Sequence, residues 1–274
     1  MSGARAIKAL IFAAGSVGGL SGAAYGLLTG QSKRARTIIG LPRDMPLNGD
    51  GLYFQDGSGP FPPINCDSLS FAVLGDSLAA GLGAELPDHL PGVRLARGLA
   101  DELSRPVKLV THAVSGSRTT DLEAQVDRAL IAPPDLALII IGGNDVTSRT
   151  SIGTSANLLG RQVTRLMNAG TTVVVGTCPD LGIVRPIPQP LRSIASQYSL
   201  SLARAQRRVL DRVKARAVSL AALLSPEFVA RPDELFSADR FHPNGKGYEF
   251  ATSVLLAPLC GALRVGKVAS WSGI

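Results

Sequence analysis

Short apolar segments alternate with amphipathic segments from residue 69 onward, and this alternation strongly limits the folds open to the chain. A run that is almost wholly apolar, such as Asp135 to Ile141, is typical of a strand covered on both faces. Strands are predicted at residues 69–74, 107–114, 135–141, 171–177 and 218–220. Helices are predicted at residues 93–103, 119–130, 155–169, 191–217 and 247–259. This order predicts an α/β fold with a mostly parallel five-stranded sheet covered by helices on both faces.

Polar and glycine-rich residues follow four of these predicted strands. They are Gly75-Asp76-Ser77, Ser115-Gly116, Gly142-Gly143-Asn144-Asp145 and Cys178-Pro179-Asp180. Sites in open parallel sheets form at the carboxyl ends of the strands, so this architecture brings all four segments to one edge. The sequence therefore predicts a functional site at that edge.

Ser77, Asp239 and His242 together supply the groups that serine-based acyl transfer needs. Ser77 follows the first strand and opens a helix, where backbone N–H groups and the helix dipole favour a developing oxyanion. A carboxylate bonded to one imidazole nitrogen leaves the other nitrogen to take the serine proton, and Asp239 lies three residues before His242. Taken alone, Asp76-Ser77 also fits a simple helix cap, and the Asp–His pair fits local loop packing.

Two further residues are candidate donors to an oxyanion. Gly116 presents a backbone N–H with no Cβ in the way, although, taken alone, an ordinary strand-to-helix turn explains it better. Asn144 follows two glycines, and its amide is an effective oxyanion donor, with capping or turn chemistry as the alternative. Asp145 is interpreted as a structural or capping residue.

The composition narrows the classes of partner. The chain has 274 residues, is 45% hydrophobic and 18% charged, and carries a formal net charge of +7, so it can form a sizeable core. We find no zinc spacing, aromatic RNA-binding motif or helix-turn-helix signature, so an anionic membrane surface explains the basic charge better than nucleic acid does. The three cysteines define neither a disulfide framework nor a metal site.

The N-terminus predicts a membrane segment. Residues 9–30 carry no charge and are followed by a basic stop, Lys33-Arg34-Ala35-Arg36. An uncleaved anchor is favoured over a cleaved signal peptide, which would make the protein secreted. The predicted organisation is an anchor or signal segment with its basic flank at 1–36, a linker at 37–68, a catalytic domain at 69–262 and a tail at 263–274.

The long helix predicted at residues 191–217 is strongly basic. Its cations are Arg192, Arg204, Arg207, Arg208, Arg212, Lys214 and Arg216, and its one acidic residue is Asp211. A basic face of this kind can lie on anionic lipid, and the alternative is a solvated helix face.

The four blocks described above resemble those of the GDSL, or SGNH, hydrolases. The chain carries, in the order of that family, Gly75-Asp76-Ser77-Leu78, Gly116, Gly142-Gly143-Asn144-Asp145 and Asp239-Arg240-Phe241-His242. The resemblance covers roughly residues 69–260 and implies a flavodoxin-like three-layer α/β/α sandwich. It implies Ser77 as nucleophile, His242 as base and Asp239 as its orienter. The backbone of Ser77, Gly116 and Asn144 would form the oxyanion hole, with no metal and no cofactor.

From residues and resemblance together, the predicted function is hydrolysis of carboxylic esters, as by an esterase or lipase, through an acyl-enzyme on Ser77. The substrate would be a small-molecule, lipid or sugar ester. An acyltransferase or carbohydrate deacylase on the same scaffold is the alternative, and an inactive membrane-anchored binding module is a further one. The expected location is the cell membrane of a bacterium, with the catalytic domain outside the cytoplasm.

Overall fold

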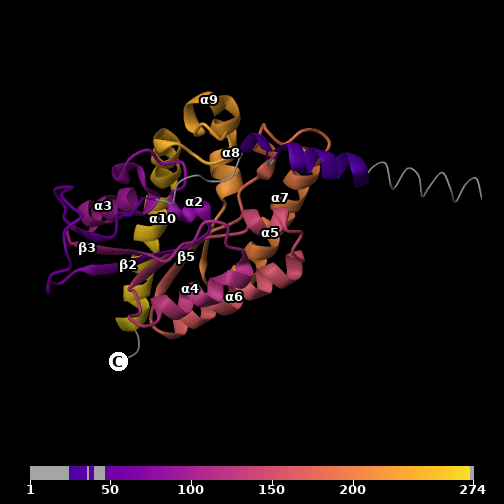
Figure 1. Cartoon of the computed structure of the whole chain (residues 1–274). Coiled ribbons are helices and arrows are strands. Elements are labelled where there is room, and N and C mark those ends of the chain that lie inside the picture. The colour runs from indigo at the N-terminus through magenta and orange to yellow at the C-terminus, as the bar shows by residue number, and fades with distance from the viewer. Residues whose placement is uncertain (1–24, 36, 40–46, 272–274) are drawn as a thin grey trace, which may run out of the picture.

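The computed structural model describes residues 25–35, 37–39 and 47–271, with side chains to residue 264. Most of the predicted N-terminal segment, including residues 1–24, therefore lies outside the described residues. The described chain forms a three-layer α/β/α sandwich, as predicted (Figure 1). None of the helices within the described residues combines the length and the apolar character needed to span a bilayer.

The central layer is a sheet of six strands in the order β1-β3-β2-β4-β5-β6. Its strands are β1 (Gly51–Tyr53), β2 (Leu69–Gly75), β3 (Val107–Thr111), β4 (Leu136–Ile140), β5 (Thr172–Gly176) and β6 (Arg216–Val218). All neighbours are parallel except β1, which runs antiparallel to β3. The carboxyl ends of the five parallel strands consequently share one edge.

Strand β1 corrects two predictions. The sheet has six strands rather than five, and the sixth lies inside the segment 37–68 that was predicted to be a linker. With only three residues it shows no sustained alternation, but Gly51 to Tyr53 pair with Leu109 to Val107. The Tyr53 side chain is fully buried, and the Arg97 guanidinium lies 5.6 Å above its ring.

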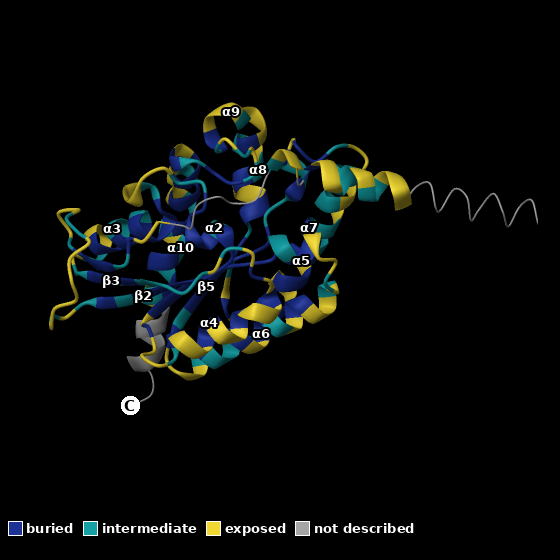
Figure 2. Cartoon of the chain, in the orientation of Figure 1, coloured by how far each residue is buried: buried dark blue, intermediate teal, exposed yellow. Residues whose placement is uncertain are grey.

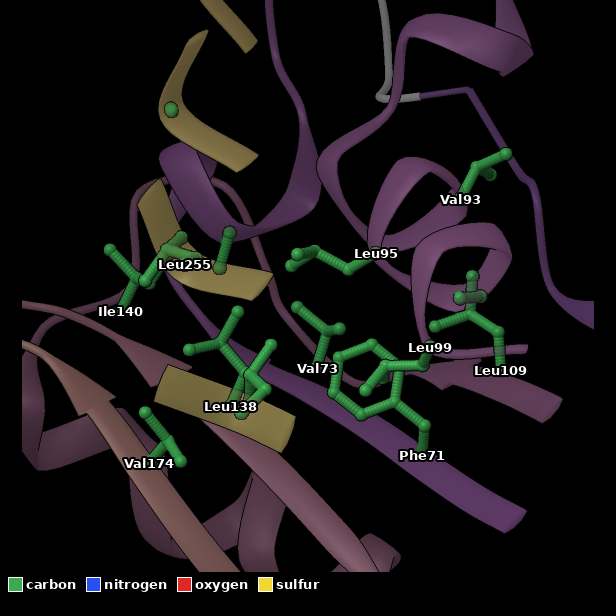
Figure 3. Close-up of a cluster of buried hydrophobic side chains, with 14 of the residues drawn as sticks. Phe71, Val73, Val93, Leu95, Leu99, Leu109, Leu138, Ile140, Val174 and Leu255 are labelled. Carbon is green, nitrogen blue, oxygen red and sulfur yellow. The ribbon is translucent and has the colours of Figure 1, made fainter. Parts of the chain in front are cut away.

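Helices cover both faces of the sheet. One face carries α3 (Pro91–Leu103), α8 (Leu220–Ala230) and α10 (Gly245–Trp271), and the other carries α4 (Leu122–Ala129), α6 (Ile152–Asn168) and α7 (Leu191–Arg212). Figure 2 shows this most clearly for α4 and α6, which are exposed outward and buried toward the sheet. Alternate residues of β2 serve the two cores: Phe71 and Val73 pack with α3, and Ala72 and Leu74 pack on the opposite side (Figure 3).

The remaining elements are short. They are α2 (Ser77–Ala80), α5 (Gly143–Thr147), α9 (Pro232–Leu235) and the 3₁₀ helices η1 (Pro87–His89), η2 (Thr119–Asp121) and η3 (Leu181–Ile183). Residues 25–35 form a further helix that lies beside the start of α7 (Figure 1). Its Gln31 side chain accepts a hydrogen bond from the Leu191 N–H, and its Ala35 belongs to a buried apolar cluster that includes Leu181 and Val184.

Three C-terminal boundaries differ from prediction. Helix α7 ends at Arg212 rather than at 217, because Lys214 adopts a left-handed φ of 60° and the chain turns into β6. Strand β6 lies at 216–218 rather than 218–220, and α8, which follows it, was not predicted. Helix α10 continues to Trp271, so most of the predicted tail 263–274 is helical in its backbone.

Candidate active site

Ser77 lies at the carboxyl end of β2, the strand between β3 and β4. It is the first residue of α2, so its N–H has no acceptor within the helix. The Asp76 carboxylate caps the same helix by accepting a hydrogen bond from the Leu78 N–H at 3.1 Å. Ser77 is largely buried, with 9% of its surface exposed, at the wall of a pocket.

His242 and Asp239 reach Ser77 from the loop between α9 and α10. The Ser77 Oγ lies 2.9 Å from the Nε2 of His242, and the His242 Nδ1 lies 2.6 Å from an Asp239 Oδ2. The second Asp239 oxygen accepts hydrogen bonds from the N–H groups of Phe241 and His242 and from the Ser237 hydroxyl. The structure thus joins all three predicted catalytic residues in one continuous line of hydrogen bonds.

These contacts set the charge of the Asp239 carboxyl. Burial acts to raise its pKa, but the hydrogen bonds from the His242 side chain and from two backbone N–H groups outweigh burial and hold the pKa at about 2. Asp239 is therefore an anion at neutral pH and can fix the Nδ1–H tautomer of His242.

The candidate oxyanion donors lie on the two neighbouring strand ends. Gly116, in the loop after β3, has a left-handed φ of 84°, and a Cβ at this position would meet no atom within 4 Å. Asn144 is in the first turn of α5, and its Nδ2 donates to the Ser117 carbonyl at 3.0 Å. An amide nitrogen has two donors, so one N–H of Asn144 is left for an oxyanion.

Asp145 is fully buried behind this site. Its Oδ2 accepts hydrogen bonds from the backbone N–H and the hydroxyl of Thr119, each at 3.0 Å, and Thr119 Oγ1 lies 2.9 Å from Ser155 Oγ. These contacts tie α5 to η2 and α6, in keeping with the structural role inferred from the sequence.

Asp76, which directly precedes Ser77, is almost completely buried. Burial is the main reason that its pKa rises to about 6, and the hydrogen bond from Leu78 and the charge of His242 offset only part of that rise.

The pocket in front of Ser77 is mainly apolar. Besides Ser77, Asn144 and His242, its wall includes Leu78, Leu181, Ile183, Val184, Leu220, Leu224, Phe228, Phe236 and Phe241. Residues 179–181 and helix α8 contribute to the wall, whereas the proline-rich stretch 185–190 is not part of it. Arg192 lies in a separate shallow groove between α7 and α8.

Two buried glutamines near the site were missed in the sequence. The Gln125 side chain holds the backbone of Gly75, and the Gln206 side chain bridges Cys178 N–H and Ile141 C=O. The signal for Gln125 is its position: it lies with Leu122, Val126 and Ala129 on the buried stripe of α4. Among the described residues, no group of three or more His, Cys, Asp or Glu side chains is arranged to hold a metal ion.

A Ser–His–Asp line at the carboxyl edge of a parallel sheet in a three-layer α/β/α fold is the arrangement found in serine hydrolases. The GDSL-like Lipase/Acylhydrolase family model matches residues 73–250 of this chain. A GDSL-like esterase of Mycobacterium tuberculosis is 41% identical over 245 residues, which cover 88% of this chain and 78% of that protein. The chain belongs to the GDSL-like lipase/acylhydrolase family.

Solved structures agree with this fold. The lipase Lip_vut3 from a goat rumen metagenome aligns with a TM-score of 0.58 at 20% identity, over 70% of this chain and 97% of that one. A lipase/acylhydrolase from Enterococcus faecalis aligns with a TM-score of 0.56 at 20% identity, over 70% of this chain and 96% of that one. The acetylxylan esterase Axe2 from Geobacillus stearothermophilus aligns with a TM-score of 0.55 at 19% identity, over 70% of this chain and 94% of that one.

Proposed function

We propose that this protein hydrolyses carboxylic esters through an acyl-enzyme on Ser77. The observation that carries the proposal is the unbroken line from Ser77 Oγ to His242 Nε2 at 2.9 Å and from His242 Nδ1 to Asp239 at 2.6 Å. A serine hydroxyl is a weak nucleophile until a base within hydrogen-bond reach takes its proton, and His242 is within that reach.

In the proposed reaction, Ser77 Oγ attacks the ester carbonyl carbon while its proton passes to His242 Nε2. The carbonyl oxygen becomes an oxyanion that accepts hydrogen bonds from the N–H groups of Ser77 and Gly116 and from the Asn144 amide. The C–O bond then breaks, and His242 returns the proton to the leaving alcohol. Water, deprotonated by His242, attacks the acyl-enzyme; the bond from the acyl carbon to Ser77 Oγ then breaks, His242 returns the proton to Ser77 Oγ, and the acid is released. Asp239 stabilises the imidazolium in both halves.

The pocket favours an ester with an apolar group over a sugar. Its wall holds eight Leu, Ile, Val or Phe side chains in addition to Leu78, and burying apolar surface stabilises a bound complex by about 25 cal/mol per Å². A carbohydrate deacylase, as in Axe2, would need more polar partners than this wall offers. An acyltransferase would share the acyl-enzyme and differ only in the acceptor, so partition between acid and new ester at varied alcohol concentration separates the two.

A fluorophosphonate probe and a panel of acetyl to long-chain esters, thioesters and acylated sugars test the proposal. We expect the wild-type protein to be labelled and to hydrolyse apolar esters, Ser77→Ala to lose both, and Ser253→Ala, an exposed serine of α10, to keep both. Labelling or turnover that persists in Ser77→Ala, or a folded wild type that is never labelled, contradicts the acyl-enzyme. The second result favours the inactive binding module.

We also propose that the protein is membrane-tethered through its N-terminal segment, with the catalytic domain outside the cytoplasm. The uncharged stretch at residues 9–30 supports the tether, and its end overlaps the helix at 25–35, where Tyr25 and Leu27 are exposed. Ala35 of that helix belongs to the same buried apolar cluster as Leu181 and Val184 of the pocket wall, so a tether there would keep the catalytic domain close to lipid. A C-terminal alkaline phosphatase fusion should be active, and an inactive fusion contradicts this orientation.

A further inference from the structure

The peptide of Gly75 lies at a break in the sheet. Strand β3 pairs with β2 as far as Val73 and Thr111, and beyond it the Val114 N–H still donates to the Gly75 carbonyl at 3.1 Å before the chain turns toward Gly116. On the opposite side, β4 continues to pair with Gly75. Regular strand pairing on the β3 side therefore ends shortly before the Asp76-Ser77 turn, and the Gly75 N–H bonds a side chain instead of a strand.

The Gln125 side chain occupies this break. Its Oε1 accepts a hydrogen bond from the Gly75 N–H at 2.8 Å, and its Nε2 donates to the Gly75 carbonyl at 2.9 Å. A primary amide carries the same donor and acceptor pair as a peptide, so Gln125 supplies the acceptor for the Gly75 N–H and shares the Gly75 carbonyl with the Val114 N–H. Gln125 is 1% exposed, so water does not replace these bonds.

The same amide reaches the oxyanion loop. Gln125 Nε2 also donates to Ser117 Oγ at 3.1 Å, and Ser117 immediately follows Gly116. The Ser117 carbonyl in turn accepts the hydrogen bond from Asn144 Nδ2 at 3.0 Å. One side chain thus connects the turn that carries Ser77, the loop that carries Gly116 and, through Ser117, the Asn144 amide.

We infer that Gln125 is a positioning residue for the oxyanion hole: its carboxamide fixes the Gly75 turn and the Gly116–Ser117 loop in one geometry. The inference rests on the proposed serine mechanism and adds to it a residue outside the four sequence blocks. Donors to an oxyanion act only when they are held at the position where charge develops, so loosening them slows chemistry more than it weakens substrate binding.

Gln125→Met tests this role, because methionine has a similar length and volume but cannot make the three hydrogen bonds. The matched control is Gln162→Met: Gln162 is also buried, on α6, but bonds Arg165 rather than a strand end. For Gln125→Met we expect kcat on an apolar ester to fall about 10- to 100-fold with KM within about twofold, since loss of a direct oxyanion donor costs about 10²–10³. Gln162→Met should change kcat less than about twofold.

A trifluoromethyl ketone separates positioning from a general structural effect. Its adduct with Ser77 places an oxygen where the oxyanion forms, so its affinity should fall in Gln125→Met by about the same factor as kcat/KM. An unchanged kcat, or a loss of kcat with full affinity for the ketone, overturns the inference. Hydrolysis that survives Ser77→Ala would instead contradict the proposed mechanism, so the two failures are distinguishable.

Two further variants keep the test decisive if Gln125→Met does not fold. Ser117→Ala removes only the hydroxyl contact and should lower kcat about 3- to 10-fold, and an unchanged kcat counts against the inference. Gln125→Glu introduces a buried carboxyl that can donate only while protonated, so its activity relative to wild type should decline as pH rises. A constant ratio across pH 5 to 9, on a folded variant, overturns the donor role.

Discussion

At the scale of single residues, Gly75 sets the position of the nucleophile. Its φ is 137°, and a Cβ built there would overlap the Ile140 carbonyl oxygen of β4. The next N–H, that of Asp76, donates to this carbonyl at 3.1 Å. Only glycine lets β2 approach β4 this closely in a backbone conformation that side chains rarely adopt.

Gly75→Ala should therefore lower both stability and activity. We expect a loss of more than about 1 kcal/mol in the free energy of unfolding from the backbone conflict, and about a 100-fold loss in kcat/KM if the serine shifts by about 1 Å. Gly170→Ala is the matched control, because Gly170 also has a positive φ, of 89°, but open space around it. Urea unfolding and ester hydrolysis measure the two effects. Equal losses in both variants would mean that the clash with Ile140 is unimportant.

The buried Asp76 carboxyl predicts a stability that depends on pH. Its pKa is about 6 in the folded state against an ordinary 3.8, so the folded protein holds this proton more tightly than the unfolded chain. The contribution of this group to the free energy of unfolding is fully present below about pH 4 and is lost as the pH rises through 6. At 1.36 kcal/mol per pKa unit, the loss amounts to about 3 kcal/mol.

Asp76→Asn keeps an oxygen that can accept from Leu78 N–H but cannot ionise. We expect this variant to be more stable than wild type by about 1–3 kcal/mol at pH 8, with the gap closing toward pH 4. Urea unfolding at several pH values measures it. Asp101→Asn, at an exposed position of α3, makes the same change in charge and should show no such trend. A gap that widens toward low pH would mean that the folded protein holds the Asp76 proton less tightly than the unfolded chain does.

At the scale of elements, local patterns revealed the site better than they revealed its surroundings. The Gly-Asp-Ser and Asp-x-x-His blocks are contiguous in sequence, so their residues could be identified before the structure. The contact of Gln125 with Gly75 spans 50 residues and depends on which face of α4 meets the sheet. Strand β1 has only three residues, too few to show the alternation of apolar and polar residues that is typical of a strand. Helix α8 is apolar around most of its surface and contains Pro226, so its sequence shows no apolar stripe at helical spacing.

Helix α8 should control which acyl groups fit, because Leu224 lies in the pocket wall and is 5% exposed. Leu224→Trp would fill part of the pocket, so kcat/KM for octanoyl esters should fall at least about tenfold relative to acetyl esters. Leu223→Trp, one residue along the same helix, is the control, since Leu223 is 41% exposed and is not part of the pocket wall. If both variants keep the chain-length profile of wild type, α8 does not bound the acyl site.

At the scale of the whole molecule, helix α7 is one of the strongly basic elements, with five arginines against the single acidic residue Asp211. Arg204, Arg208 and Arg212 are spaced four residues apart on α7, and all three are exposed. Residues at this spacing share a face of the helix. The single acidic residue of α7, Asp211, pairs with Arg207 at 3.9 Å rather than with these three arginines. The helix at residues 25–35 contacts the start of α7, whereas these arginines lie in its C-terminal half.

This basic face predicts a preference for anionic lipid that is separate from the tether. An exposed Lys or Arg near an anionic surface contributes about 1 kcal/mol, whereas an N-terminal anchor binds neutral and anionic vesicles alike. Flotation of the full chain should therefore give more binding to phosphatidylglycerol than to phosphatidylcholine vesicles, and Arg204→Glu/Arg208→Glu/Arg212→Glu should lower that ratio at least about tenfold. Arg118→Glu/Arg149→Glu/Lys246→Glu makes the same change in net charge at exposed positions elsewhere and should leave the ratio nearly unchanged. An equal fall in both triple variants would show that net charge, rather than the α7 face, attracts the lipid.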